Sequence, residues 1–263
     1  MSARFSRRRT TKLRTMTHPD VESLERAVLA AVAPPQVEEL PGWLLAFDNG
    51  TVGRAKSAVP IVHDNPRREA IAEIEARYAA HGLPPVFRIP ATQSFDGLRD
   101  ELAARGLRES KPTQMQVAAT SDVGRISKAP AADVSAQADD EWASVFLGEG
   151  FDPVDGASRV QTLRRAKDSL YACVRDEGRV VAGGVLSLAH GWASIHGMRT
   201  ARSHRGKGLA SRIIATFANI AQERGYERMM LQVERNNEAA QRLYARCGFH
   251  TAWDYSYWET PAS

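Results

Sequence analysis

The sequence lacks any apolar run of about 18 residues, so no transmembrane helix is expected. Its first fifteen residues contain no apolar core, which a secretory signal would need. Cysteine is scarce. Cys173 and Cys247 are the two cysteines, neither lies in a C-x-x-C motif, and both are expected to be reduced, buried thiols of a cytoplasmic protein. The seven histidines are scattered, so neither a structural zinc site nor a metal cofactor is expected.

The formal net charge of +4 over 263 residues comes from the beginning of the chain. Six basic residues and no acidic ones lie there: Arg4, Arg7, Arg8, Arg9, Lys12 and Arg14. Without those six, the 35 basic residues fall to 29, against 31 acidic ones. Residues 1–16 are therefore predicted to form a disordered basic arm. The arm either binds nucleic acid or another anionic surface, or extends the chain upstream of a natural start at Met16, the interpretation we favour.

The rest of the chain divides into two parts of similar length and element order. Residues 17–120 and residues 139–263 are each predicted to contain helices, a hairpin and alternating helices and strands, joined by a small, polar linker at 121–138. Asn49-Gly50 predicts a hairpin turn between two extended runs of the first part. The predicted fold class is α/β (α+β), with tandem domains in which a mixed, mostly antiparallel sheet is flanked by helices.

A short basic loop precedes the helix predicted from Leu209 to Gly225. The loop reads Arg205-Gly206-Lys207-Gly208, and apolar residues at helical spacing follow it. Glycines at a helix start let an anion approach backbone N–H groups that have no partner in the helix, and two cations add charge. The loop is therefore interpreted as a pyrophosphate site, although a glycine-rich turn or a nucleic-acid contact would also fit. A P-loop motif is missing, and Glu234 lies 26 residues after Gly208, a poor match to a dinucleotide fingerprint.

Two motifs together carry a resemblance to a known family. R-G-K-G-L-A resembles the Q/R-x-x-G-x-G/A motif of the GNAT (Gcn-five-related N-acetyltransferase) superfamily, and residues 237–249 resemble its N-x-x-A-x-x-L-Y-x-x-x-G-F signature. The likeness covers roughly residues 139–258. The whole chain also resembles a bacterial two-domain subgroup, in which a degenerate GNAT-like half precedes the catalytic one. GWLLAFDNG and GLPPVFR carry that weaker likeness.

The resemblance implies transfer of an acetyl group from acetyl-CoA to a primary amine of a small molecule or peptide, by direct attack in a ternary complex. The strand ending at residues 198–200 would pair with the pantetheine arm, and a gap beside it would admit the thioester. Tyr244 would be the general acid, and Asn237 would cap its helix and contact CoA. The residues implied to bind acetyl-CoA are Met198, Arg199, Thr200, Arg205, Gly206, Lys207, Gly208, Leu209, Ala210, Asn237 and Tyr244.

The general base stays open at this point. The strand W-A-S-I-H-G-M-R-T carries no acidic residue, so His196 on that strand and Glu234 at the end of the next one are both candidates. An acyl-CoA-binding sensor without turnover is the alternative to an enzyme.

The N-terminal half has no counterpart of the glycine-rich motif and is expected to bind no CoA. It would extend the sheet, shape the acceptor cleft or form a dimer surface, so a monomer and a homodimer are both compatible. No partner is expected beyond acetyl-CoA and an amine, with no membrane contact and no nucleic acid.

Overall fold

The computed structural model of the chain describes residues 18–148 and 151–261, so the predicted basic arm lies outside the described part. Its strands form one sheet in the order β1-β2-β3-β4-β11-β5-β10-β9-β8-β7-β6. The strands are β1 (Gln36–Leu40), β2 (Trp43–Phe47), β3 (Ala58–Pro60), β4 (Phe87–Pro90), β5 (Arg108–Ala119), β6 (Asp133–Ser135), β7 (Ser169–Asp176), β8 (Arg179–Ala189), β9 (Trp192–Thr200), β10 (Arg228–Glu234) and β11 (His250–Glu259).

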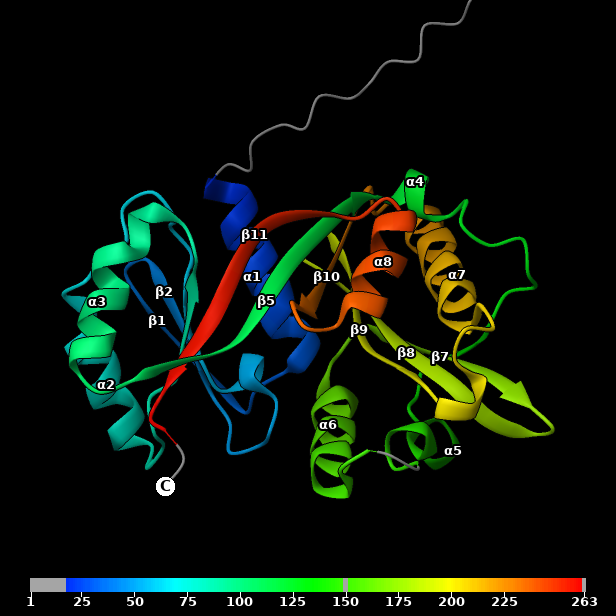
Figure 1. Cartoon of the computed structure of the whole chain (residues 1–263), viewed down its shortest axis with the longest axis horizontal. Coiled ribbons are helices and arrows are strands. Elements are labelled where there is room, and N and C mark those ends of the chain that lie inside the picture. Colours follow the sequence, from blue (N-terminus) through cyan, green and yellow to red (C-terminus); the bar gives the residue numbers. More distant parts are fainter. Residues whose placement is uncertain (1–17, 149–150, 262–263) are drawn as a thin grey trace, which may run out of the picture.

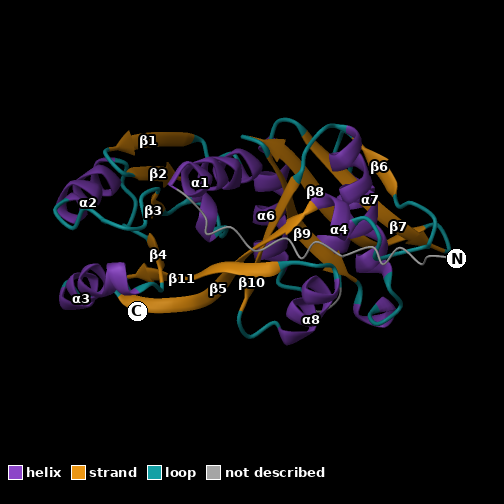
Figure 2. Cartoon of the chain, turned by 90° about the horizontal axis from the view of Figure 1, so that it is seen from above, coloured by secondary structure: helices purple, strands orange, loops and turns teal. Residues whose placement is uncertain are grey.

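Helices cover both faces of this sheet. The α-helices are α1 (His18–Val32), α2 (Ala70–Ala80), α3 (Asp96–Ala104), α4 (Thr120–Val123), α5 (Asp140–Ala143), α6 (Pro153–Arg165), α7 (Leu209–Glu223) and α8 (Glu238–Arg246). Short 3-10 helices are η1 (Gly53–Ala55), η2 (Gln93–Phe95), η3 (Ser144–Phe146) and η4 (Arg202–His204). Figure 2 shows α2 and α3 at one end of the molecule and α7 and α8 toward the other. Within the described part, no helix combines the length and the apolar character needed to cross a membrane.

The two halves of the sequence share the sheet. Strand β5 from the first half lies between β10 and β11 of the second half and pairs antiparallel with both. Strand β11 in turn pairs with β4 along its other edge. Figure 1 shows β5 and β11 running side by side across the molecule. The predicted α+β class, with a mostly antiparallel sheet flanked by helices, is confirmed. The proposed domain boundaries remain a prediction, and the sheet itself is continuous across them.

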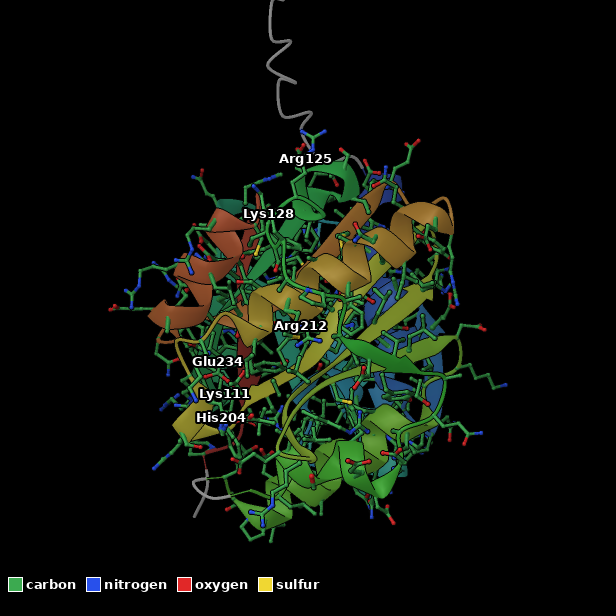
Figure 3. The ribbon with its side chains drawn as sticks, turned by 90° about the vertical axis from the view of Figure 1, so that its right-hand side faces the viewer. Lys111, Arg125, Lys128, His204, Arg212 and Glu234 are labelled. Carbon is green, nitrogen blue, oxygen red and sulfur yellow. The ribbon has the colours of Figure 1, made fainter. Side chains whose placement is uncertain are left out.

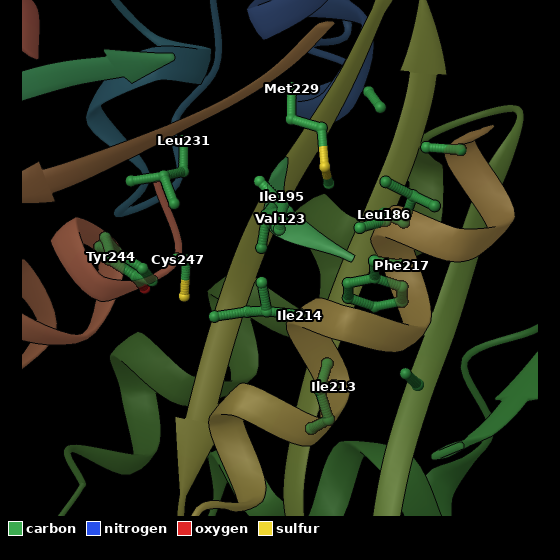
Figure 4. Packing of buried hydrophobic residues seen from close by; sticks show 14 of the residues in the cluster. Val123, Leu186, Ile195, Ile213, Ile214, Phe217, Met229, Leu231, Tyr244 and Cys247 are labelled. Atoms are coloured by element: carbon green, nitrogen blue, oxygen red, sulfur yellow. The ribbon is translucent and has the colours of Figure 1, made fainter. Parts of the chain in front are cut away.

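The two faces of the sheet have different cores. On one face, α7 and α8 pack on strands of the second half through Ile213, Phe217 and Tyr244, together with Ile195 and Leu231 (Figure 4). On the opposite face, α1 packs through an apolar stripe against both halves, including Trp192 of β9 and Tyr255 of β11. On this same face, helices α5 and α6 pack beside α1 on strands β7 and β8. We refer to these surfaces as the α7 face and the α1 face.

The predicted hairpin at Asn49-Gly50 is wrong in detail. The tight turn lies at Pro41-Gly42, between β1 and β2, where Gly42 adopts φ +83°. Strands β2 and β3 do pair antiparallel, but ten residues that include η1 join them. The carboxylate of Asp48 is buried, accepts a hydrogen bond from the Gly50 N–H at 2.5 Å and pairs with Arg165. These contacts hold the segment as a wide loop, which we call the 48–57 loop.

The two cysteines are buried and unpaired, as predicted from their number and spacing.

A buried ion pair lies under the shared strands. Arg88 of β4 donates to both carboxylate oxygens of Glu25 in α1, at 3.1 and 2.5 Å, and both side chains are 1% exposed. Burial raises the pKa of the Glu25 carboxyl, although the Arg88 charge acts in the opposite direction. The pair ties the helix of the α1 face to the centre of the sheet.

Removing one member of this pair is expected to be costly. An Arg88→Met variant leaves the Glu25 carboxylate buried without a counter-ion, so unfolding in urea should require about 3–5 kcal/mol less free energy. The double variant with Glu25→Leu should recover a large part of that loss. The exposed Arg77 serves as the control, because its ion pairs lie at the surface and Arg77→Met should cost less than about 1 kcal/mol. Equal losses for both arginines would contradict this role.

Candidate functional site

A gap opens in the sheet between β9 and β10. The two strands pair in parallel from Ala193–Met229 to Ile195–Leu231. Beyond these positions they no longer pair with each other, although β9 continues to Thr200 and β10 to Glu234. The cause is a β-bulge in β9, where two residues oppose one on β8. Gly197, at the bulge, has φ +58°, a conformation that a side chain would strain. The free edge of β9 beyond Ile195 leaves backbone groups available to an extended ligand.

A cavity of about 580 Å³ lies at this gap and is lined from both halves of the chain. Residues 195–199 of β9 and 232–234 of β10 form its walls, and Tyr244 of α8 reaches it from the α7 face. The N-terminal half contributes residues 51–54 of the 48–57 loop. Among the described residues there is no cluster of three or more histidine, cysteine, aspartate or glutamate side chains suited to a metal.

The glycine-rich loop leads into α7 just beyond the strand that lines the cavity. Gly206 and Gly208 have φ +76° and +78°, and a Cβ added to either would meet no atom within 4 Å. Gly208 is the N-cap of α7, and no side chain caps the helix. Within the described part of the chain, the first N–H groups of α7 therefore have no side-chain cap, and the pyrophosphate site expected there stays a prediction. The loop itself is not part of the cavity wall, whereas Met198 and Arg199 are.

The strand before the loop divides its side chains between the two faces. Met198 packs into the core of the α7 face. The Arg199 guanidinium lies 4.4 Å from the centre of the Phe151 ring. Burial lowers the pKa of Arg199. Thr200 pairs with Ala182 of β8 at the end of β9. His204, in η4, contacts Asp176 at 2.9 Å from its Nε2.

Asn237, the N-cap of α8, and Tyr244 within α8 both line the cavity from the side of the α7 face. The Asn237 side chain accepts a hydrogen bond from the Ala240 N–H at 3.2 Å, so it caps the helix. Tyr244 is 7% exposed, and burial raises its pKa to about 12. At neutral pH the phenol therefore carries its proton, with its ring packed beside Leu231 and Cys247 in the α7-face core (Figure 4). A buried phenol at the gap is a hydrogen-bond donor toward any group that enters it.

His196 lies on the α1 face, and its surroundings oppose protonation. It is 3% exposed, and the Arg54 Nη1 lies 3.0 Å from its Nδ1. Burial, followed by the Arg54 charge, lowers its pKa well below the usual value. Because a guanidinium can only donate, we assign Nδ1 as the acceptor and the proton to Nε2. His196 is therefore a neutral imidazole whose basic nitrogen is already engaged.

Glu234 ends β10 at the rim of the cavity and is exposed. Within the described part of the chain, its carboxylate makes no hydrogen bond and no salt bridge. Lys111 of β5 also lines the cavity, and Figure 3 shows these two side chains near each other on the same side of the molecule. An accessible carboxylate at this rim can accept a proton directly or through water.

Sequence reasoning missed Arg54. Its loop belongs to the N-terminal half, 142 residues away from His196 in the chain, and no motif surrounds it. The structure brings it to the point where β9 and β10 separate, where its Nη1 also lies 3.5 Å from the Gln232 Oε1. Only the fold could reveal this contact.

Comparisons with known proteins show similarity to N-acetyltransferases. Residues 137–249 match the model of the "Acetyltransferase (GNAT) family". The chain is 28% identical to the "Uncharacterized N-acetyltransferase YobR" of Bacillus subtilis, over 90% of this chain and 98% of the relative.

Solved structures resemble the fold at lower identity. A GCN5-related N-acetyltransferase from Kribbella flavida matches with a TM-score of 0.69 and 20% identity, over 92% of this chain and 96% of that one. A tandem GNAT protein from the clavulanic acid biosynthesis pathway matches with a TM-score of 0.56 and 16% identity, over 93% and 96%.

Proposed function

We propose that residues 137–249, which match the model of the GNAT acetyltransferase family, form a domain of that family, and that the chain acetylates a primary amine of a small molecule or peptide with acetyl-CoA. The amine would attack the thioester directly in a ternary complex. The observation that carries the proposal is the gap between β9 and β10, where the cavity lies, together with the glycine-rich start of α7 that follows the end of β9. Release of thiol from acetyl-CoA with a panel of amines tests it. Binding of acetyl-CoA without turnover would favour a sensor instead.

Each part of acetyl-CoA has a counterpart around the gap. The pyrophosphate would lie on the N–H groups at the start of α7, with Arg205 and Lys207 nearby. The pantetheine arm would pair with the free edge of β9 at residues 198–200. Its thioester would then reach the gap, where Tyr244 lies. Asn237, besides capping α8, lines the same cavity and would contact CoA there.

Tyr244 would donate its proton to the departing thiolate. A simple thiol has a pKa of about 8.5, below that of the buried phenol. The same burial that raises the tyrosine pKa to about 12 would also raise that of a thiolate formed beside it, because desolvation disfavours both anions. Burial therefore shifts the pKa values of the donor and the acceptor in the same direction.

Of the two candidate bases, Glu234 fits the geometry better. An amine reaches the site as an ammonium and must lose a proton before it attacks. Glu234 presents an accessible carboxylate that no described residue engages. His196 is neutral, but its free nitrogen carries the proton and Arg54 occupies the other nitrogen. We therefore propose Glu234 as the base and His196 as a wall of the acceptor cavity.

The anion site is tested by adding a charge to it. A Gly208→Glu variant should lose measurable acetyl-CoA binding in calorimetry, because the carboxylate would occupy and repel the pyrophosphate. Gly106→Glu is the matched control: Gly106 also has positive φ (+89°) and open space around it, but it lies outside the cavity and the loop. Unchanged acetyl-CoA affinity in Gly208→Glu would remove the loop from the binding site.

The role of Tyr244 is tested by removing its hydroxyl. Tyr244→Phe should lower kcat by about 100-fold, the scale of one general acid, while acetyl-CoA affinity stays within a few-fold. Tyr226→Phe is the control, because Tyr226 packs against the same core but does not line the cavity. If Tyr244→Phe keeps full activity, the phenol takes no part in the reaction.

The two candidate bases are separated by parallel amide substitutions. Glu234→Gln should lower kcat by about 100-fold or more, because the amide cannot accept the proton. His196→Gln keeps a polar group beside Arg54 and should have the smaller effect on kcat. A larger loss in His196→Gln, with an unchanged melting temperature, would reverse the assignment.

A further inference from the structure

Arg54 is a cation in the cavity wall without a counter-ion. The cavity is lined by four cationic residues, namely Arg54, Lys111, Arg159 and Arg199. Lys111 lies 4.0 Å from Glu259, and Arg159 and Arg199 share Asp155 at 2.6 and 3.8 Å. None of the salt bridges between described residues includes Arg54. Arg54 is partly buried, and a charge removed from water is costly unless an opposite charge accompanies it.

The neighbours of Arg54 are polar but uncharged, apart from other arginines. Its Nη1 faces the His196 Nδ1 and the Gln232 Oε1, and Tyr255 donates to that same Gln232 oxygen at 2.7 Å. Its Nε and Nη2 donate to no other described residue. Burial lowers the Arg54 pKa; Tyr257 and Tyr255 act against this shift, and the charges of Arg159 and Arg88 add to it. The protein thus surrounds this guanidinium with groups that do not neutralise it.

The fold holds Arg54 in place. The 48–57 loop is fixed to α6 by the Asp48–Arg165 ion pair, by Thr51 Oγ1 on Asp155 at 2.8 Å and by the Thr51 N–H on Ser158 at 2.9 Å. Gly53 lies so close to Tyr257 that an added Cβ would come within 2.7 Å of the ring. The loop therefore presents a guanidinium at a fixed point of the wall, ready for a ligand.

Two further buried donors next to Arg54 have no partner. The Nε2 atoms of His196 and Gln232 are buried and unpaired within the described part of the chain. Buried polar groups are nearly always hydrogen-bonded, so exceptions at a cavity wall indicate a ligand or water. Both atoms are donors in these assignments, as is the guanidinium. These donors call for acceptors, and an acceptor that is also an anion would in addition neutralise Arg54.

We infer that Arg54 binds a carboxylate of the acceptor, so that the substrates are amines that also carry a carboxylate. The inference rests on the proposed acetyl transfer and specifies its acceptor class. A guanidinium matches a carboxylate in two parallel hydrogen bonds, which would use the free Arg54 donors. Glu234 lies two residues beyond Gln232 on β10, about 7 Å further along the same strand face. One ligand could therefore present its carboxylate to Arg54 and its amine to the gap.

The test compares each amine with a partner that is neutral where the amine carries its carboxylate. Acetylation of free amino acids is measured against the corresponding amino acid amides, as kcat/KM from thiol release. The wild-type chain should prefer the free acids by about tenfold or more. Arg54→Met should abolish that preference and leave acetyl-CoA affinity unchanged, and Arg54→Lys should keep part of it. Arg67→Met, an exposed arginine outside the cavity, should behave as wild type.

Calorimetry separates this inference from the proposed function. Amino acids are titrated into the complex with desulfo-CoA, and wild type should bind them more tightly than Arg54→Met does. If acids and amides react or bind alike in wild type, or if Arg54→Met keeps the preference, the inference is overturned. If no amine is acetylated but the Arg54-dependent binding persists, carboxylate recognition by Arg54 stands and the acetyl transfer fails. A melting temperature measured for each variant excludes loss of folding as the cause.

Discussion

The site depends on one interruption of hydrogen bonding, the separation of β9 from β10 after three paired positions. A sheet ordinarily continues its ladder as far as both strands extend, and here β9 is bent away by a bulge at Gly197. The backbone groups that lose their partners become the edge to which an extended ligand can add. Because the strands separate, the cavity between them is lined by side chains from both faces of the sheet. Ligands on the two faces could therefore meet at the gap.

A gap of this kind requires support from the neighbouring strands. Strand β10 keeps a full partner along its other edge, because β5 pairs with it over its whole length. Strand β9 is likewise held by β8 on either side of the bulge. The N-terminal half thus does more than lengthen the sheet: it supplies the strand that fixes one wall of the gap and, through the 48–57 loop, the cation that faces it.

The features that could be predicted from the sequence are those set by residues close together in the chain. The glycines of the 205–210 loop and the Asn237 cap act within a few residues, and the structure contains the open helix start and the cap hydrogen bond. The Asn49-Gly50 hairpin was also a local inference, and it failed because Asp48 is buried and paired with Arg165, far along the chain. Arg54 carries no local signal, since only long-range strand pairing brings it to His196.

The placement of β5 makes the two halves dependent on each other. Strand β11 lies between β4 and β5, and β5 lies between β11 and β10. Cutting the chain at the predicted linker would therefore expose strand edges in both parts. The 48–57 loop would also lose its contacts with α6. A C-terminal half with the glycine-rich loop and Tyr244 intact would therefore still lack the part of the cavity wall that carries Arg54. The candidate site residues are divided by the faces of the sheet more than by the order of the sequence: Tyr244 packs on the α7 face, and Arg54 lies beside His196 on the α1 face.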